Sequence, residues 1–188
     1  MNWNTCIADC LDEQPAEEVR LVCGDQLNGR HSWFQESPNA HRLYVLMEIR
    51  SETDYAVHHL QKVVAFFGAM RLFAQSLKGA GHRVHYVALD SPGNQQSFEA
   101  NIERLMRTVQ STRFQWQLPD EYRLDEVLAK FGESCRKRGW TATSVDTEHF
   151  YTERADLARF FEGKKTFRLE SFYRAMRLKH DVLMDAMG

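Results

Sequence analysis

The chain has 188 residues, of which 43% are hydrophobic and 27% are charged, and its formal net charge at pH 7 is -2. A chain of this length can bury about 70% of its unfolded surface, so it needs no disulfide or metal to fold around a single core. The small net charge gives the chain as a whole no electrostatic signature of nucleic-acid binding, and no apolar run approaches the ~20 residues of a membrane-spanning helix.

The N-terminal residues 1–18 contain neither the basic region nor the apolar core of a secretory signal, which predicts a cytoplasmic location and reduced thiols. The chain has four cysteines, which are Cys6, Cys10, Cys23 and Cys135. Because they form no CxxC pair and have no histidine at zinc-ligand spacing, we expect no metal site.

Short apolar runs alternate with amphipathic stretches as far as Asp146. The apolar runs predict strands at 19–23, 43–48, 84–89, 114–118 and 140–145. The amphipathic stretches predict helices at 55–78, 97–109 and 120–138, and residues 28–42 are expected to form a loop or a short helical connection. This order predicts an α/β fold with a mainly five-stranded parallel sheet, right-handed crossovers and helices on both faces.

Only helices are predicted after Asp146, at 153–161 and 169–184. We therefore expect an α/β domain over residues 1–150 and a helical segment over 151–188. Basic residues clearly outnumber acidic ones between Arg159 and Lys179. That stretch has three interpretations, which are a solvated helix face, a face that docks on another domain and a stripe that faces DNA.

Polar residues follow three of the predicted strands at the point where each strand ends. The carboxyl ends of strands line the ligand crevice of an open α/β sheet, so these residues are candidates for contact with a bound molecule. The candidates, with one aromatic residue of the long predicted helix, are Gly24, Asp25, Gln26, Glu48, Glu52, Tyr55, Phe66, Pro119, Asp120 and Glu121. We expect at least one of Glu48 and Glu52 to point into the crevice.

Each candidate also has an ordinary structural interpretation. Asp25 can cap local amides in a turn, and Glu52 can be a capping or surface residue. Asp120 can be the N-cap of the helix that follows it, and Phe66 lies on the apolar stripe of the helix at 55–78. Thr53 or Asp54 is the expected N-cap of that long helix.

The sequence contains no GxGxxG and no GxxxxGK[ST] spacing, which disfavours a phosphate-binding loop. His58 and His59 are adjacent, so their side chains diverge by about 100° on a helix and cannot easily bind one ion. The simplest expectation is one packed and one exposed histidine. No catalytic residue is assigned, because no Ser-His-Asp or Cys-His arrangement can be assembled from the sequence.

Five motifs occur in an order that resembles the N-terminal part of the deoxyribodipyrimidine photolyase-related family, the bacterial iron-sulfur photolyases and cryptochromes with (6-4) photolyase-like members. They are GDQLN (24–28), ETDYAVHHLQKVVAFFGAMRLFA (52–74), GHRVHY (81–86), PDEYRL (119–124) and GKKTFRLESFYRAMR (163–177). The resemblance runs from about Val19 to the last residue. It implies a Rossmann-like domain that binds an antenna chromophore, typically 6,7-dimethyl-8-ribityllumazine.

In that family the chain continues into a helical domain that holds FAD and an iron-sulfur cluster and acts on pyrimidine photoproducts in DNA. The resemblance therefore implies that 151–188 is a linker toward such a domain and that FAD, the cluster and DNA bind only there. The family includes DNA photolyases, which are lyases. This chain alone is expected to pass excitation to FAD in the other domain and to catalyse no reaction itself. Its exposed C-terminal helices predict self-association.

Two other classes of function remain open from the sequence. One is a stand-alone Rossmann-like enzyme in which Asp25 and Glu48 act with His58 or His59. The other is an interaction module whose basic helical tail binds DNA or a partner.

Overall fold

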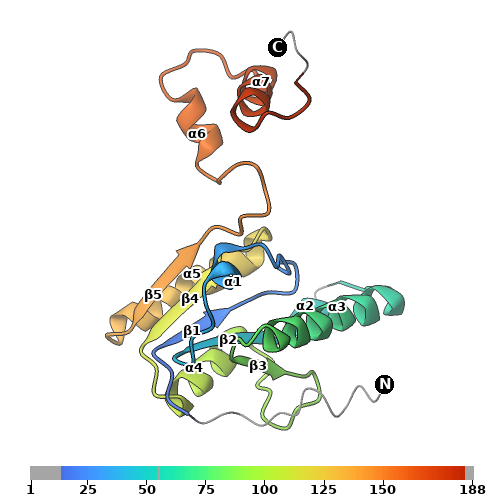
Figure 1. The fold of residues 1–188 in the computed structure, drawn as a ribbon, viewed down its shortest axis with the longest axis vertical. Helices are drawn as coiled ribbons and strands as arrows, with labels where there is room; N and C mark the ends of the chain where they lie inside the picture. The colour runs from blue at the N-terminus through green and yellow to red at the C-terminus, as the bar shows by residue number, and fades with distance from the viewer. Residues whose placement is uncertain (1–13, 55, 185–188) are drawn as a thin grey trace. The chain divides into compact units, whose positions relative to one another are not determined.

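The computed structural model describes residues 14–54 and 56–184 of the chain (Figure 1). These residues form two compact units. The first, here called the α/β unit, ends at Thr147, and the second, the helical unit, begins at Glu148.

The α/β unit is built on one parallel sheet of five strands, and this confirms the predicted fold class. The strands are β1 (Glu18–Leu21), β2 (Arg42–Met47), β3 (Val84–Val87), β4 (Arg113–Gln117) and β5 (Thr141–Val145). Their order across the sheet is β3-β2-β1-β4-β5. All four pairs of neighbouring strands are parallel, so the carboxyl ends of the strands meet at one edge.

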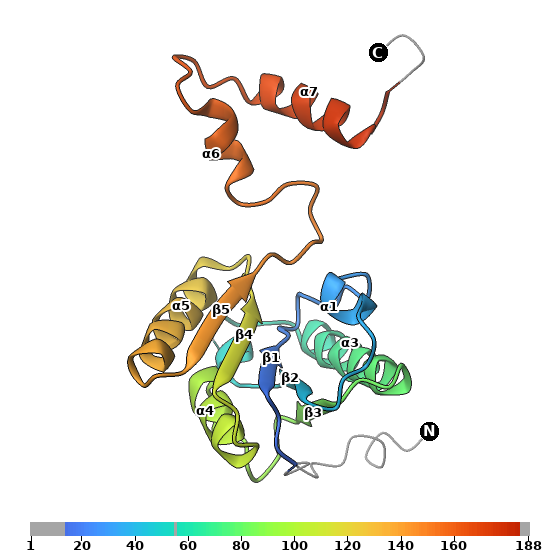
Figure 2. The same cartoon turned by 60° about the vertical axis from the view of Figure 1, so that its left-hand side comes forward.

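Helices cover both faces of this sheet. They are α1 (Ser32–Gln35), α2 (Ser51–Asp54), α3 (Leu60–Gly79), α4 (Phe98–Thr108) and α5 (Tyr122–Lys137). Figure 2 shows α4 and α5 on one side and α1 and α3 on the other. Alternate strand residues pack into the two apolar layers, as Val19 and Leu21 do on the α4 and α5 side and Val22 does on the α3 side.

The helix predicted at 55–78 is present but begins later than expected, so the expectation that Thr53 or Asp54 is its N-cap is wrong. α2 ends at Asp54, and α3 begins at Leu60. The N-cap of α3 is His59, whose Nδ1 accepts a hydrogen bond from the backbone N–H of Gln61 at 3.2 Å. An imidazole nitrogen can thus replace the usual side-chain oxygen at this position.

The N-cap prediction at Asp120 is also wrong. α5 begins at Tyr122, and its N-cap is Glu121, whose side chain makes no capping hydrogen bond. Both carboxylate oxygens of Glu121 instead accept from Arg123, at 2.8 and 2.9 Å.

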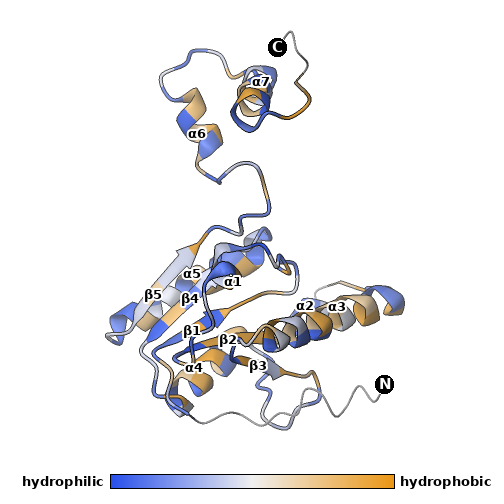
Figure 3. Ribbon diagram, viewed as in Figure 1, coloured by the Kyte–Doolittle hydropathy of each residue, from blue (hydrophilic) through white to orange (hydrophobic). Residues whose placement is uncertain are grey.

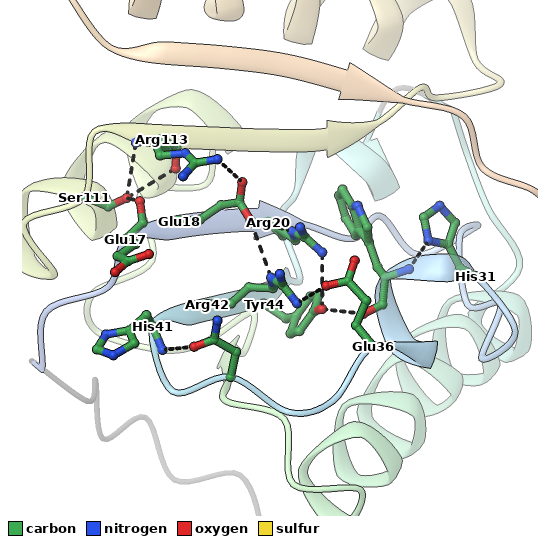
Figure 4. A network of polar contacts seen from close by, with 12 residues as sticks. Glu17, Glu18, Arg20, His31, Glu36, His41, Arg42, Tyr44, Ser111 and Arg113 are labelled. Carbon is green, nitrogen blue, oxygen red and sulfur yellow. Dashed lines mark hydrogen bonds and ion pairs between the residues drawn. The ribbon is translucent and has the colours of Figure 1, made fainter.

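The amino ends of the central strands hold a network of charges (Figure 4). Glu18 lies within ion-pair distance of Arg20 at 2.8 Å, Arg42 at 3.5 Å and Arg113 at 3.7 Å. The guanidinium of Arg20 also lies over the ring of Trp33, 4.8 Å from its centroid. Two charged residues of β1, Glu18 and Arg20, are therefore buried. The sequence pattern predicts this strand as an apolar run that begins at Val19.

The helical unit contains α6 (Asp156–Phe161) and α7 (Leu169–His180). The ring of Phe160 makes edge-on contacts with Phe161 and Phe172, at centroid distances of 4.9 and 5.3 Å. Figure 3 shows apolar and polar residues together on both helices, and Phe167 and Tyr173 remain 73% and 56% exposed. Across the described parts of both units, no helix combines the length and the apolar character needed to cross a membrane.

One buried carboxylate fixes the carboxyl end of β2. Glu48 is fully buried, and its Oε1 accepts from Arg71 Nε and from the Tyr86 hydroxyl, both at 2.6 Å. Its Oε2 accepts from Arg71 Nη2 and from the backbone N–H of Leu89, both at 2.9 Å. Burial, and then the neighbouring Glu48 carboxylate, raise the pKa of Tyr86, which keeps its hydroxyl protonated as a donor. This side chain ties β2 to β3, α3 and the loop before α4.

The substitution Glu48→Gln tests this network. An amide has one acceptor oxygen in place of two, so part of the Arg71 guanidinium loses its partner. We expect the free energy of unfolding to fall by about 1.5 to 3 kcal/mol, the range for hydrogen bonds to charged groups. Urea denaturation followed by circular dichroism measures it.

Glu170→Gln is the matched control, because Glu170 pairs with Arg174 at an exposed i,i+4 position. It is expected to change stability by less than about 0.5 kcal/mol. Equal losses in the two variants would contradict a structural role for Glu48.

Candidate ligand-binding site

A cavity of about 230 Å³ opens at the carboxyl edge of the sheet. It is called the carboxyl-edge pocket here, and it is lined by Asp25, Glu52, Thr53, His58, Lys62, Val63, Phe66, Glu121 and Leu124. These residues come from the turn after β1, from α2, from α3 and the segment before it, and from the start of α5. Chain segments nearly 100 residues apart therefore meet at the edge where ligands bind in open α/β sheets.

Three carboxylates surround this pocket. They belong to Asp25, Glu52 and Glu121. Arg123 joins two of them, because its Nη2 donates to Glu52 Oε1 at 3.0 Å and it also binds Glu121. This clamp connects α2 to the start of α5 and fixes the direction of both carboxylates.

Glu52 carries its charge at a cost. Burial raises the pKa of the Glu52 carboxyl, and the carboxylates of Glu121 and Asp25 raise it further, although Arg123 acts in the opposite direction. Perturbed carboxyl pKa values cluster at functional sites, and ion-pair networks such as the one Glu52 forms with Arg123 and Glu121 also produce them.

Two basic side chains complete the polar rim. Lys62 Nζ on α3 lies 3.4 Å from Nδ1 of His58, which precedes the N-cap of this helix. His59 is the N-cap of α3 and is exposed, whereas His58 precedes it and is half-buried, so, contrary to the expectation from the sequence, neither histidine lies within the helix. Within the described residues, no group of three or more His, Cys, Asp or Glu side chains is arranged to hold a metal ion.

Phe66 forms an apolar wall of the pocket, and it packs directly on the backbone of Gly24. A Cβ atom at position 24 would meet the Phe66 ring, and it would lie 2.8 Å from Met70 Sδ. Glycine is therefore required so that the turn after β1 can approach α3 closely. The half-buried Phe66 ring belongs both to the apolar layer and to the pocket wall.

Gln26 and Glu48 do not line this pocket, which corrects two of the candidate positions. Gln26 is fully buried, its Oε1 accepts from the Cys23 N–H at 2.9 Å, and its Nε2 donates to the Gln117 carbonyl at 3.1 Å. Gln26 thus ties the ends of β1 and β4 together. Glu48 is committed to Arg71 and Tyr86, and of the pair Glu48 and Glu52 only Glu52 reaches the pocket.

The remaining candidates are placed differently. Pro119 is buried and Asp120 is exposed, and neither lines the pocket. Tyr55 lies outside the described residues. Sequence reasoning missed Arg123 as a site residue, although a basic residue two positions after Glu121 was a local signal for an ion pair.

The fold places the protein in the class of doubly wound α/β domains. Its pocket has a polar rim and an apolar wall and lies at the carboxyl edge of the sheet. Residues 20–188 match the family model described as deoxyribodipyrimidine photo-lyase-related protein, and the chain belongs to this family. It is also similar to a "(6-4) photolyase" from Agrobacterium fabrum (strain C58 / ATCC 33970), with 30% identity over 168 residues. That match covers 89% of this chain and 32% of the relative, so the chain spans about a third of the relative's length.

The contact between Gly24 and Phe66 gives a prediction about stability. Gly24→Ala is expected to destabilise the α/β unit by about 1 to 3 kcal/mol, because the added methyl overlaps Phe66 and Met70. In a Phe66→Ala background the same change should cost clearly less, and urea denaturation of the four proteins gives the coupling energy. Purely additive losses would mean that the ring does not limit position 24.

The raised pKa of Glu52 gives a prediction about pH. The folded state holds this proton more tightly than the unfolded chain, so stability falls as the pH rises from the ordinary glutamate value through the raised folded value. Glu52→Gln should remove this fall and make the protein more stable than the parent at neutral pH.

Glu103→Gln is the control of opposite sign. The hydrogen bonds from Arg138 and Arg107 lower the pKa of Glu103, so its charge stabilises the fold above the ordinary glutamate value. This variant should be less stable than the parent at neutral pH, and its deficit should disappear in acid. Urea denaturation at a series of pH values from acid to neutral measures the stability of both variants. A loss of stability in Glu52→Gln at neutral pH would contradict a raised pKa of Glu52.

Proposed function

We propose that the carboxyl-edge pocket binds an antenna chromophore, and that this chromophore is 6,7-dimethyl-8-ribityllumazine. The observation that supports this proposal is the meeting of Asp25, Glu52 and Glu121 with Phe66 around one cavity, in a member of the photolyase-related family. Carboxylates accept hydrogen bonds from ring N–H groups and from ribityl hydroxyls. The phenyl ring offers an apolar surface for a flat heterocycle.

The size of the pocket favours a small ring system. Its volume of about 230 Å³ is below the ~300 Å³ at which cavities for drug-sized ligands begin, so a bicyclic ring suits it better than a dinucleotide such as FAD. The three carboxylates would repel the negative charge of a phosphorylated ligand. Lys62 and His58 can donate hydrogen bonds to ring carbonyl oxygens. The donor set therefore fits an uncharged ribityl compound.

In this proposal the residues of the chain bind and orient the pigment and exclude water from it. When bound, such a pigment supplies absorption of near-ultraviolet or blue light and transfer of the excitation to FAD. FAD, the iron-sulfur cluster and the DNA photoproduct would be held by another domain of a photolyase-type protein. No bond is made or broken in the α/β unit.

A second function has support from the helical unit. Phe167, Leu169 and Tyr173 are more than half exposed, close to the basic residues Lys164 and Lys165. Such a surface suits an interaction module, or self-association through these helices. The enzyme alternative has less support, because Glu48 is enclosed by Arg71 and Tyr86 and is withdrawn from His58.

Titration of the purified chain with 6,7-dimethyl-8-ribityllumazine, with FAD in parallel, tests the first function. We expect saturable lumazine binding with a shifted absorption and fluorescence spectrum, and no binding of FAD. Asp25→Asn and Glu52→Gln should each weaken lumazine binding about tenfold, the effect of one hydrogen bond to a charged group.

Glu126→Gln is the control, because Glu126 pairs with Lys130 on α5 and is not among the residues that line the pocket. It should leave the affinity unchanged. Binding of neither ligand would overturn the proposal, and self-association in the same samples, measured by light scattering, would then favour the interaction module.

A further inference from the structure

A second cavity, of about 280 Å³, lies at the β3 edge of the sheet on the side of α4. It is called the edge cavity here, and it is lined by Val45, Met47, His85, Val87, Ser91, Pro92, Gly93, Asn101, Arg104 and Leu105. It shares no lining residue with the carboxyl-edge pocket.

The strand order explains why this cavity exists. α4 leads from β3 at the edge to β4 on the far side of β2 and β1, so the helix crosses over the middle of the sheet. Its residues Ile102 and Met106 are fully buried in the central apolar layer. The α4 face of β3 is thereby left incompletely covered, although both faces of a parallel sheet normally are covered.

The floor of the edge cavity is apolar and rigid. Val45 and Met47 on β2 are the register partners of His85 and Val87 on β3, so these four side chains stand side by side on one face. Val45, Met47 and Val87 are at most 8% exposed, and with Leu105 of α4 they belong to the main apolar cluster. A hydrocarbon group that binds here would be removed from water, and no core side chain would have to move to make room for it.

The rim is polar, and part of it is held in place by hydrogen bonds. The buried Asn101 donates through Nδ2 to Asn94 Oδ1 at 2.9 Å and accepts from the Gln95 N–H at 2.8 Å. Arg104 reaches from α4 across the opening, where its Nη1 donates to the Gly93 carbonyl. Its guanidinium has five N–H groups. The hydrogen bond to one carbonyl uses one of them, and the others can donate to a carboxylate.

The charge of this rim is opposite to that of the carboxyl-edge pocket. Among the described residues that line the edge cavity none is acidic, and Arg104 and His85 are basic. A buried apolar floor beneath a guanidinium is complementary to a molecule with a hydrocarbon body and one negative charge.

We propose that the edge cavity binds a small apolar carboxylic acid, with an aromatic or branched hydrocarbon group on the floor formed by Val45, Met47 and Val87 and its carboxylate on Arg104. The volume limits the ligand to about one or two rings, since it is slightly below the range of ~300 to 1,000 Å³ for drug-sized ligands. This site is independent of lumazine binding, because the two cavities have different walls.

The probe for this proposal is 2-naphthoate, and its neutral analogue 2-naphthamide is the matched control ligand. Both are titrated into the full chain by isothermal calorimetry. We expect saturable binding of 2-naphthoate, with the amide at least tenfold weaker because it cannot form a charged pair with Arg104. Arg104→Gln should weaken 2-naphthoate about tenfold and leave the amide nearly unchanged.

Arg107→Gln is the control variant, because Arg107 lies on the same helix, pairs with Glu103 and is not a lining residue of the cavity. It should bind 2-naphthoate like the parent. Arg104 and Arg107 are both exposed, so both variants are expected to fold, and circular dichroism checks this.

Four results would each overturn the proposal, three of them in these titrations. Those three are equal affinities for the acid and the amide, equal losses in the two arginine variants, and no binding up to the solubility limit of the probe. Competition between 2-naphthoate and lumazine would also overturn it, because that result would place the acid in the carboxyl-edge pocket. Failure of lumazine to bind leaves the proposal for the edge cavity unaffected.

Discussion

The position of α3 depends on the buried carboxylate of Glu48. Its oxygens accept hydrogen bonds from Nε and Nη2 of Arg71, from the Tyr86 hydroxyl and from the backbone N–H of Leu89. A buried carboxylate is strongly unfavourable unless such partners surround it, so loss of any of the four contacts is expected to be costly. Because α3 also carries Phe66, the same interaction sets one wall of the carboxyl-edge pocket.

The carboxyl-edge pocket brings three carboxylates close together. Glu52 remains close to Asp25 and Glu121, and its environment raises its pKa even with Arg123 beside it. Glu18, at the other end of the sheet, is surrounded by arginines and so has its charge compensated. The two ends of the sheet therefore differ in how their charges are compensated, and the carboxyl edge is the end at which ligands generally bind in such folds.

The two cavities of the α/β unit have separate physical origins. The carboxyl-edge pocket arises where strands end and their loops separate, as in other open α/β sheets. The edge cavity arises because the connection from β3 to β4 passes β2 and β1, so that α4 cannot also cover β3. The first is lined by three carboxylates together with Lys62 and His58, whereas the charged or basic side chains that line the second are Arg104 and His85.

The sequence by itself determined the order of strands and helices, and it determined that Asp25, Glu52 and Glu121 follow strand ends, because apolar periodicity and turn residues are local signals. Only the tertiary structure decided which carboxylates face a ligand. Glu48 turns toward Arg71, 23 residues away, and Gln26 donates to Gln117, 91 residues away. Such partners are brought close by the packing of helices on the sheet, and no local pattern encodes that distance.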